Sequence, residues 1–421
     1  MLTNAPKGTK DMLPQEAYKW KYVRKEFAEI AEKYGFKQID TPVFEHTELF
    51  HRGVGDTTDI VQKEMYTFED HGGRSITLRP EGTSPVVRSF VEHKIYADPQ
   101  PTKMFYDISC FRYEKPQAGR LRQFHQFGIE VFGTDKMIAD AEVIALGYEF
   151  LQKMGITGVE LRINSIGCPN CRENHRAALR DFLRPKYDEL CNTCKDRFDK
   201  NPLRILDCKS PVCHELVQGA PVMLDYLCDE CQTAFDELKE NLDAMGIEYV
   251  VDAGIVRGLD YYTKTAFEFV SNTGRAQSTV CGGGRYDNLI EQVGGPSTPG
   301  VGFGLGIERL LLTMEECGIE IPKEDRTDVF IVMMGEKAKK YGLGLASQFR
   351  AKGVKTQIDL LARNIKGQMK NADRAGAKYA VIIGDNEIES GVLGVKVLDE
   401  SRQIEVSMDS IIDTICGELD K

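Results

Sequence analysis

The chain lacks any apolar run that approaches the roughly 18 residues needed to cross a membrane. Its first twenty residues also lack the apolar core of a secretory signal. Positive charge is not in excess: 54 Lys and Arg stand against 65 Asp and Glu, and the net charge is −11. A uniformly basic nucleic-acid-binding surface is therefore excluded, and any polyanion must meet a local patch. We expect a soluble, cytoplasmic protein that makes no membrane contact.

The phosphate-binding pattern GxxxxGK[ST] is also missing. Phosphate groups would then have to be held by arginines, whose guanidinium groups bind them with two hydrogen bonds at once. The alternating glycines of GVGFGLG, from Gly300 to Gly306, do not indicate a dinucleotide fold, because neither a βαβ unit nor a ribose-binding acid accompanies them. One face of this predicted strand carries no side chain, so we expect a flat ligand to lie against it.

The length of 421 residues indicates more than one domain, because domains usually hold about 100–200 residues. Hydrophobic residues at 42% and charged residues at 28% are typical of globular proteins. Period-two patterns between residues 75 and 133 predict antiparallel strands, and helical patterns flank them. We therefore predict an α+β fold: an antiparallel sheet flanked by helices in residues 1–325, interrupted by a mainly helical insertion at 168–250, and a C-terminal α/β domain at 326–421.

Charge is unevenly distributed over the C-terminal domain. Residues 337–378 hold eleven Lys and Arg against two acids, a net charge of +9, whereas residues 379–421 hold three against ten, a net charge of −7. A single charged run usually marks a solvated helix face. Such a polarised domain on an acidic chain also suits a module that binds a polyanion on one side.

Cysteines are concentrated in the insertion, where the motifs CPNC, CNTC, CKSPVC and CDEC hold eight of the twelve. In a chain without a secretory signal, such pairs favour metal or redox chemistry over disulfides. Four thiolates complete a tetrahedral zinc site, so we predict one or two structural zinc ions without a catalytic role. The alternatives are reduced cysteines without metal, or ligation that includes His175 or His214. The sequence leaves open the pairing of Cys168, Cys171, Cys191, Cys194, Cys208, Cys213, Cys228 and Cys231.

Two neighbouring predicted strands place polar residues on one face. These residues are Arg112 and Glu114 of KMFYDISCFRYE, beside Ile108 and Cys110, and Phe124, Gln126 and Glu130 of QFHQFGIEVFG. The loop between them adds the basic residues Lys115 and Arg120. This composition is typical of a ligand site, and the alternative is a solvated face with cross-strand ion pairs.

Three glycine-containing motifs add further candidates, although each is weak alone. They are RPEGT with Glu81, Gly82 and Thr83, RGLDYYT with Arg257, Tyr261 and Tyr262, and GGGRYD with Tyr286. In RPEGT the glycine turn lets the backbone approach a small molecule closely, whereas three-glycine turns such as that of GGGRYD are commonly just tight turns.

Taken together and in this order, the motifs resemble those of the bacterial class II histidyl-tRNA synthetases over essentially the whole chain. GFKQIDTPVFE resembles the first class II motif, which lies at the dimer interface; FRYE with RQFHQFGIEVFG resembles the second, and GFGLGIERL the third. RGLDYYT and GGGRYD resemble two signatures of the histidine enzymes. The C-terminal domain resembles their anticodon-binding domain.

The resemblance implies a homodimeric ligase that acts on L-histidine, ATP with Mg²⁺ and tRNA(His). Histidine and ATP would give histidyl-adenylate and pyrophosphate, and histidine would then pass to the 3′ end of the tRNA. Arg112 and Arg257 would be catalytic, because two fixed cations stabilise the charge that develops at the α-phosphate.

The remaining roles that the resemblance implies concern binding. ATP would contact Arg112, Glu114, Phe124 and Arg309. Histidine would contact Glu81, Gly82, Thr83, Arg112, Gln126, Glu130, Arg257, Tyr261, Tyr262 and Tyr286. The acceptor end of the tRNA would meet Lys115 and Arg120. Lys115 departs from the family, in which many members have Arg, and it cannot form the two-pronged guanidinium contact.

Two other functions are compatible with parts of the sequence. The synthetase-like regulatory subunit of the histidine-biosynthetic phosphoribosyltransferase binds ligands without catalysis, but such relatives typically lack the anticodon domain and depart at the catalytic motifs. A zinc-stabilised nucleic-acid-binding protein would explain the cysteines and the basic segment. It would leave the ordered ligand motifs unexplained.

Overall fold

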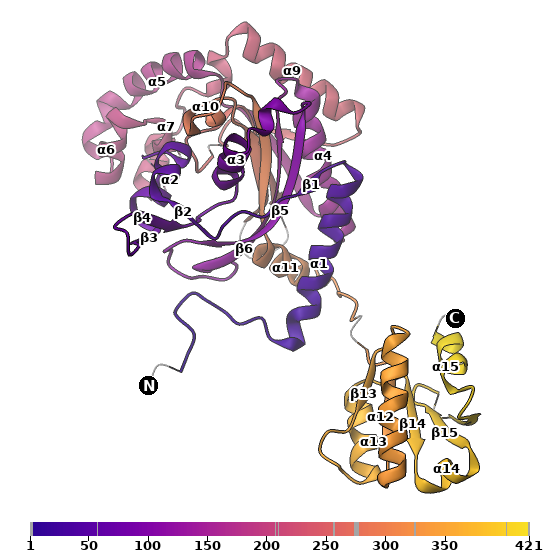
Figure 1. Ribbon diagram of the computed structural model, residues 1–421. Coiled ribbons are helices and arrows are strands. Elements are labelled where there is room, and N and C mark those ends of the chain that lie inside the picture. The colour runs from indigo at the N-terminus through magenta and orange to yellow at the C-terminus, as the bar shows by residue number, and fades with distance from the viewer. Residues whose placement is uncertain are drawn as a thin grey trace. The chain divides into compact units, whose positions relative to one another are not determined.

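The computed structural model describes residues 3–56, 58–206, 208, 210–255, 257–272, 278–323, 326–400 and 402–419. The chain divides into two compact units, residues 1–321 and 322–421 (Figure 1). In the described ranges, no helix is long and apolar enough to span a membrane.

The N-terminal unit contains a large mixed sheet, a small sheet and helices on both faces of the large sheet (Figure 1). Its strands are β1 (Lys37–Gln38), β2 (Phe44–His46), β3 (Tyr66–Glu69), β4 (Ser75–Leu78), β5 (Thr102–Phe111), β6 (Gln123–Phe132), β7 (Val159–Ser165), β8 (Val250–Val251), β9 (Thr263–Ser271), β10 (Ser278–Arg285) and β11 (Gly300–Gly306). Its α-helices are α1 (Pro14–Lys33), α2 (Thr47–Val54), α3 (Thr83–Glu92), α4 (Met137–Lys153), α5 (Pro169–Leu183), α6 (Asn192–Lys200), α7 (Leu203–Leu206), α8 (Pro211–Leu216), α9 (Asp229–Ala244), α10 (Leu289–Val293) and α11 (Ile307–Glu316).

The large sheet has the strand order β1-β5-β6-β11-β10-β9-β7-β8. Its pairs are antiparallel except β1 with β5 and β7 with β8. Helices α5 to α9 lie in the chain between β7 and β8, so the cysteine-rich segment is an insertion between two adjacent strands. The predicted α+β fold with a helical insertion is confirmed.

Strand β6 shows how the alternating pattern determines the two faces of the sheet. Phe127, Ile129 and Val131 are buried in one hydrophobic cluster with α1 and α4, and the ring of Phe27 stacks on Phe127 at 4.4 Å. Phe124, on the other face, packs at the edge of a second cluster. Burial of a Phe side chain stabilises a fold by about 1.5–3 kcal/mol, so this pairing fixes the register of β6.

The first of the two ligand-bearing strands ends earlier than the sequence pattern predicts. β5 ends at Phe111, and the peptide N–H of Glu114 turns back to donate to the Arg112 carbonyl at 2.8 Å. Arg112 keeps one ladder bond, from its N–H to the Arg122 carbonyl. Arg112 and Glu114 therefore lie in the loop after the strand, and the expected strand face with Cys110 was wrong at these two positions.

The C-terminal unit is a separate α/β fold. It contains β12 (Val329–Met333), α12 (Glu336–Ala351), β13 (Thr356–Ile358), α13 (Ile365–Arg374), β14 (Tyr379–Ile383), α14 (Asp385–Ser390), β15 (Val392–Val397), β16 (Arg402–Ser407) and α15 (Ile411–Leu419). Its strand order is β13-β12-β14-β15-β16; β13, β12 and β14 are parallel, and β15 and β16 are antiparallel. The sequence did not predict β16, because this edge strand has mostly exposed polar residues.

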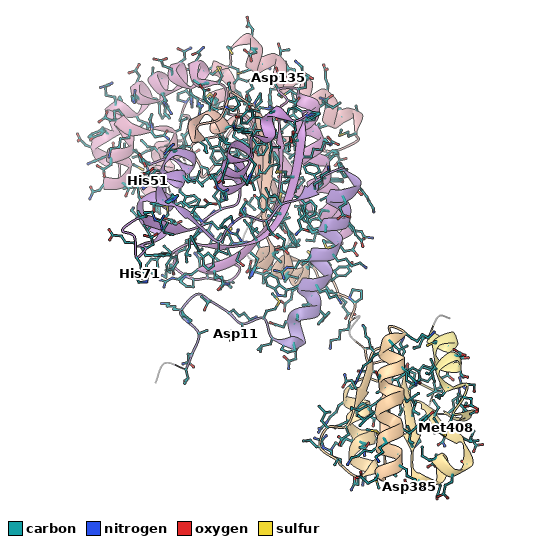
Figure 2. All side chains as sticks on the ribbon, viewed as in Figure 1. Asp11, His51, His71, Asp135, Asp385 and Met408 are labelled. Carbon is teal, nitrogen blue, oxygen red and sulfur yellow. The ribbon has the colours of Figure 1, made fainter. Side chains whose placement is uncertain are left out.

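One ion pair in the N-terminal unit is completely buried. Arg285, at the end of β10, contacts Asp140 of α4, and both side chains are 0% exposed. The guanidinium also donates to the Thr134 carbonyl at 2.8 Å. Polar side chains such as His51 and His71, by contrast, project from the surface (Figure 2). The buried pair thus connects the sheet to α4.

We predict that Arg285→Met strongly destabilises the N-terminal unit, because it leaves the Asp140 carboxylate buried without a partner. Breaking a buried pair costs about 3–5 kcal/mol. Arg74→Met, which removes the exposed pair with Asp70, should cost less than about 1 kcal/mol. Calorimetry of both variants measures the difference. Equal transition temperatures would show that the buried pair contributes no more than a surface pair.

Candidate active site

A cleft of about 380 Å³ lies over the centre of the large sheet. Most residues singled out from the sequence line it, and they come from segments far apart in the chain. These are Glu81, Thr83, Arg112, Glu114, Arg120, Phe124, Gln126, Arg257, Tyr261, Tyr262 and Arg309. Of the remaining four, Gly82, Glu130 and Tyr286 are buried beside the cleft, and Lys115 is exposed on the loop.

Arg112 is fixed at the mouth of this cleft by two contacts. Its Nε donates to the Pro80 carbonyl at 2.8 Å, and its guanidinium lies 5.2 Å over the ring centroid of Phe124. Glu114 lies 3.9 Å from Arg112 and 3.2 Å from Arg120. The loop thus presents two cations around one carboxylate, and the ring of Phe124 supplies a flat apolar surface beside them.

Arg257 is positioned by a carboxylate that the sequence analysis missed. Its guanidinium pairs with Glu268 of β9, which in turn accepts a hydrogen bond from the Thr279 hydroxyl at 2.7 Å. The buried Nε of Arg257 has no hydrogen-bond partner among the described residues. The signal was present: Glu268 interrupts the apolar run TAFEFV, and a single carboxylate in a buried strand needs a cation.

Gly282 explains how Arg257 reaches this position. A Cβ added at Gly282 would lie 2.6 Å from both terminal nitrogens of the guanidinium. The first glycine of GGGRYD, which lies in β10, therefore leaves room for a protein side chain, which then faces the cleft.

Glu130 is the centre of a buried hydrogen-bond network. Its side chain is 0% exposed and accepts hydrogen bonds from Thr83 at 2.8 Å, from Tyr106 at 3.1 Å and from Tyr286. Burial raises the pKa of Glu130 to about 8, although the three hydroxyl donors act in the opposite direction. This carboxyl group can therefore gain or lose a proton near neutral pH.

Three tyrosines form the wall above Glu130. The ring centroids of Tyr261 and Tyr262 lie 4.6 Å apart, and Tyr286 lies 5.5 Å from Tyr261. All three rings are at least 95% buried. Burial raises the pKa of each tyrosine, so the hydroxyls stay protonated and serve as hydrogen-bond donors. The wall is aromatic, with polar groups only at defined points.

The sequence analysis also missed Tyr106, whose ring explains why position 82 is a glycine. A Cβ at Gly82 or at Gly128 would lie within 2.4 Å of the Tyr106 ring. The space that a side chain at Gly82 would need is therefore filled by the Tyr106 ring. Glu81 is likewise engaged, because its two oxygens accept the N–H groups of Thr83 and Ser84 at the start of α3.

The glycine-lined face of β11 is occupied in the same way. A Cβ at Gly302 would lie 2.3 Å from Glu130 Oε2, and one at Gly304 would lie 2.0 Å from Gln126 Nε2. A third, at Gly300, would meet the ring of Tyr286 at 2.4 Å. The expectation that a flat ligand lies against this backbone was therefore wrong for these positions, which accommodate the side chains of neighbouring strands.

Helix α11 closes the cleft on one side and carries Arg309. Glu308 of the same helix was also missed by the sequence analysis. Its carboxylate accepts a hydrogen bond from the peptide N–H of His125 at 3.0 Å and lies 2.9 Å from Nδ1 of the His125 ring. This contact ties α11 to β6. Burial lowers the pKa of Arg309, but a guanidinium group stays charged in proteins, so Arg309 contributes a further cation.

We predict that Glu130 makes stability depend on pH. Its pKa in the folded chain, about 8, exceeds the ordinary value of 4.5, so the protonated form is the one that folding favours. Stability should therefore be greatest below about pH 4.5 and fall as pH rises through about 8, relative to Glu130→Gln, which cannot ionise. Calorimetric transitions of both proteins between pH 5 and 9 test this. A difference independent of pH would contradict the shifted pKa.

Comparisons with known proteins agree with this arrangement. Residues 8–310 match the family described as histidyl-tRNA synthetase, and residues 328–417 match the anticodon binding domain. The chain is 57% identical to a histidine–tRNA ligase of Caldanaerobacter subterraneus subsp. tengcongensis, over 98% of this chain and 99% of the relative. It is 56% identical to that of Clostridium perfringens (strain SM101 / Type A), over 97% and 98%.

A solved structure is also similar. The apo histidyl-tRNA synthetase of S. aureus superposes with a TM-score of 0.85 at 41% identity, covering 98% of this chain and all of that one. The sequence match spans both units, and the cleft brings together the motifs on which the resemblance rested, apart from GFKQIDTPVFE. The chain therefore belongs to the histidyl-tRNA synthetase family.

Proposed function

We propose that this chain is a histidine–tRNA ligase whose active site is the cleft over the large sheet. It would activate L-histidine with ATP and transfer it to the 3′ end of tRNA(His). The observation that carries this proposal is the meeting of separate motifs in one cleft, with cations on one side and a buried carboxyl beneath tyrosines on the other.

Histidine would occupy the end of the cleft formed by Tyr261, Tyr262 and Gln126. An imidazole presents an N–H donor, and the ionised carboxyl group of Glu130 is an acceptor for it. Because the pKa of Glu130 is about 8, this carboxyl group also exists in its protonated form near neutral pH. The aromatic wall suits a flat ring, and Glu81, Gly82 and Thr83 supply the backbone and carboxylate beside the amino group. Tyr286 would act through its hydrogen bond to Glu130.

ATP, as its Mg²⁺ complex, would occupy the end lined by Arg112, Arg120 and Arg309. The adenine would lie against Phe124, with Glu114 near its amino group. The half-buried Arg257, whose Nε keeps an unused donor, supports a role at the α-phosphate. The histidine carboxylate attacks this phosphorus and pyrophosphate leaves, while Arg112 and Arg257 stabilise the negative charge that accumulates.

The second step would use the hairpin loop and the C-terminal unit. The terminal ribose hydroxyl of the tRNA attacks the histidyl carbonyl and AMP leaves. Lys115 and Arg120 on the loop would contact the acceptor end, and the +9 segment at residues 337–378 would contact the anticodon arm. A local basic segment is the kind of patch that an acidic chain needs for this purpose.

We also propose a cytoplasmic homodimer. Large apolar side chains stay exposed around the first motif: Val43 is 42% exposed, Phe44 55% and Phe68 48%. They lie on or next to β2 and β3 of the small sheet, and large apolar side chains left exposed in this way are typical of a protein interface. A second copy of the chain would cover it.

Pyrophosphate exchange tests the activity and the role of Arg257 together. Exchange should depend on histidine and on no other amino acid. Arg257→Ala should abolish it, with a loss of about 3 kcal/mol of transition-state stabilisation, and should leave histidine binding by calorimetry largely intact. Arg74→Ala, on the surface, is the control. Near-normal exchange by Arg257→Ala would remove Arg257 from the mechanism, and exchange without histidine would remove the proposed function.

Deletion of all residues after Thr327 tests the role assigned to the C-terminal unit. The N-terminal unit has its own cores, so we expect histidine-dependent exchange to be spared much more than tRNA charging. Exchange and charging rates of the truncated and full-length chains give the comparison. Full charging by the shortened chain, confirmed to be dimeric, would assign the C-terminal unit another task.

A further inference from the structure

The eight cysteines of the insertion form two separate groups in space. In each group the four Sγ atoms lie within 4.8 Å of one another. The first group holds Cys168, Cys171, Cys228 and Cys231, and the second holds Cys191, Cys194, Cys208 and Cys213. The sequence left this pairing open, and the order along the chain is nested: the first group takes the outer two pairs and the second takes the inner two.

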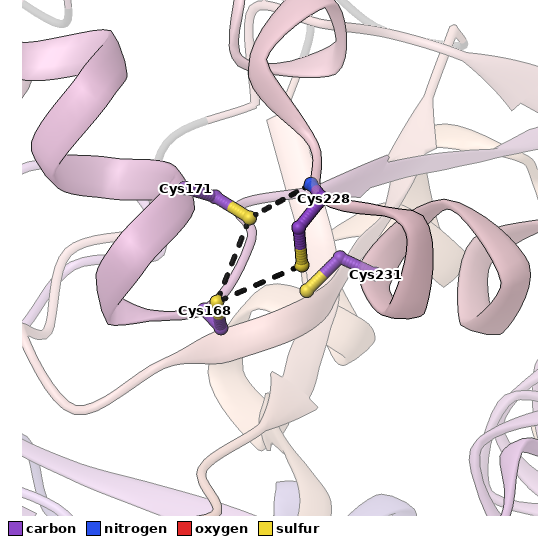
Figure 3. A group of neighbouring side chains, drawn as sticks. All are labelled: Cys168, Cys171, Cys228 and Cys231. Carbon is purple, nitrogen blue, oxygen red and sulfur yellow. Dashed lines mark hydrogen bonds between the residues drawn. The ribbon is translucent and has the colours of Figure 1, made fainter.

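The first group is built from two helix starts that face each other (Figure 3). Cys168 precedes α5 and Cys171 lies in its first turn, while Cys228 and Cys231 hold the same two positions in α9. The Sγ of Cys168 lies 3.5 Å from that of Cys171 and 4.0 Å from that of Cys228. Four thiolates around one zinc ion, each at about 2.3 Å, would be about 3.8 Å apart.

The second group follows the same plan less regularly. Cys191 precedes α6, Cys194 lies within it, and Cys213 lies in α8. The Sγ atoms of Cys191 and Cys208 are 3.9 Å apart. Sulfur separations near 4 Å exclude disulfides, whose bond is about 2.05 Å. They also suit a single ion better than an iron–sulfur cluster, in which the thiolates bind different iron atoms and lie farther apart.

Backbone N–H groups point at the sulfurs, as they do around bound thiolates. The N–H of Cys228 donates to Cys171 Sγ at 3.1 Å, and that of Cys191 donates to Cys213 Sγ at 3.3 Å. Such second-layer hydrogen bonds orient metal ligands and disperse their negative charge. The two candidate histidines are elsewhere: His175 Nε2 bonds the Pro221 carbonyl at 2.7 Å, and His214 is exposed on α8.

The fully buried apolar cores around these groups are small. One consists of five buried apolar side chains with Cys194 and Cys213, and the other consists of Met223 with Cys171 and Cys231. Segments with so few buried residues usually need a metal or cross-links. Four of the thiols in these cores are at most 1% exposed, and uncompensated thiolates would be costly there.

We propose that the insertion binds two structural zinc ions, one through Cys168, Cys171, Cys228 and Cys231, and one through Cys191, Cys194, Cys208 and Cys213. Each thiol releases its proton as it binds, and the four sulfurs complete the coordination, so neither ion has an open position for chemistry. The outer ion joins the start of α5 to the start of α9, which are the first and last helices of the insertion. The inner ion fixes helices α6 to α8.

Residues near both cysteine groups also contact residues 257–264, the segment that contributes Arg257, Tyr261 and Tyr262 to the cleft. Arg172, next to Cys171, donates to the Tyr262 carbonyl at 3.1 Å, and Glu230, between Cys228 and Cys231, pairs with Lys264 at 2.8 Å. From the inner site, Arg204 of α7 contacts Asp260 at 2.9 Å. Residues 257–264 are thus held from both zinc sites, and loss of zinc should loosen this segment.

Metal analysis of the full-length wild-type chain, purified without chelator, is the first test. We expect close to two zinc ions per chain, one for each group. Replacement of zinc by Co²⁺ should give the visible spectrum of tetrahedral thiolate coordination. Less than about 0.2 zinc per chain in a folded protein, or iron in place of zinc, would overturn the proposal.

Paired substitutions test which cysteines share an ion. Cys168→Ser with Cys228→Ser should lose one zinc, because both thiols belong to one site, whereas Cys168→Ser with Cys191→Ser should lose both. Cys416→Ser in α15, outside either group, should keep both. Loss of two ions from the first variant, or of none from the second, would overturn the assignment.

Chelation of the wild-type chain separates a structural ion from an incidental one, even if a variant fails to fold. Hydrogen exchange should increase first in α5–α9 and in residues 257–264, before it increases in β5 and β6. Histidine-dependent pyrophosphate exchange is recorded in parallel but does not decide the outcome. Unchanged protection of α5–α9 after complete loss of zinc would overturn the structural role.

Discussion

The site depends on one constraint, which is the room available for polar side chains at the centre of the large sheet. Polar side chains lie flat over neighbouring strands because those strands have glycine where a Cβ would collide. Gln126 occupies the space over Gly304, Glu130 that over Gly302, and Arg257 that over Gly282. Without these glycines the side chains would have to turn away, so the glycine motifs act through the residues that they accommodate.

The same geometry permits charge to be buried at low cost. Arg257 is paired with Glu268, which is held by Thr279, and Glu130 receives three hydroxyl donors, so each charged or polar group has its main partner before substrate arrives. Groups held in this way do not need to reorganise as charge develops in the transition state. For a histidine–tRNA ligase, this means that activation depends on the strands that support the cleft as much as on the residues that line it.

Much of this arrangement was predictable, and the exceptions have physical reasons. The alternating pattern of β6 separated Phe127 from Gln126 correctly, because burial follows period two along a strand. The end of β5 was not predictable from that pattern, since a local hydrogen bond turns the chain at Arg112. Glu268 and Tyr106 were missed because their importance lies in contacts with residues distant in sequence. The pairing of the cysteines depended on the fold for the same reason.

The most direct measurement is the affinity for histidine, by calorimetry, of Gly304→Ala, Gln126→Ala and the double variant. If Gly304 serves to make room for Gln126, the single variants should weaken binding to a similar extent, and the double variant should be no weaker than Gln126→Ala alone. Additive losses, or unchanged affinity in Gly304→Ala, would contradict the claim that the glycines position the polar side chains of the cleft.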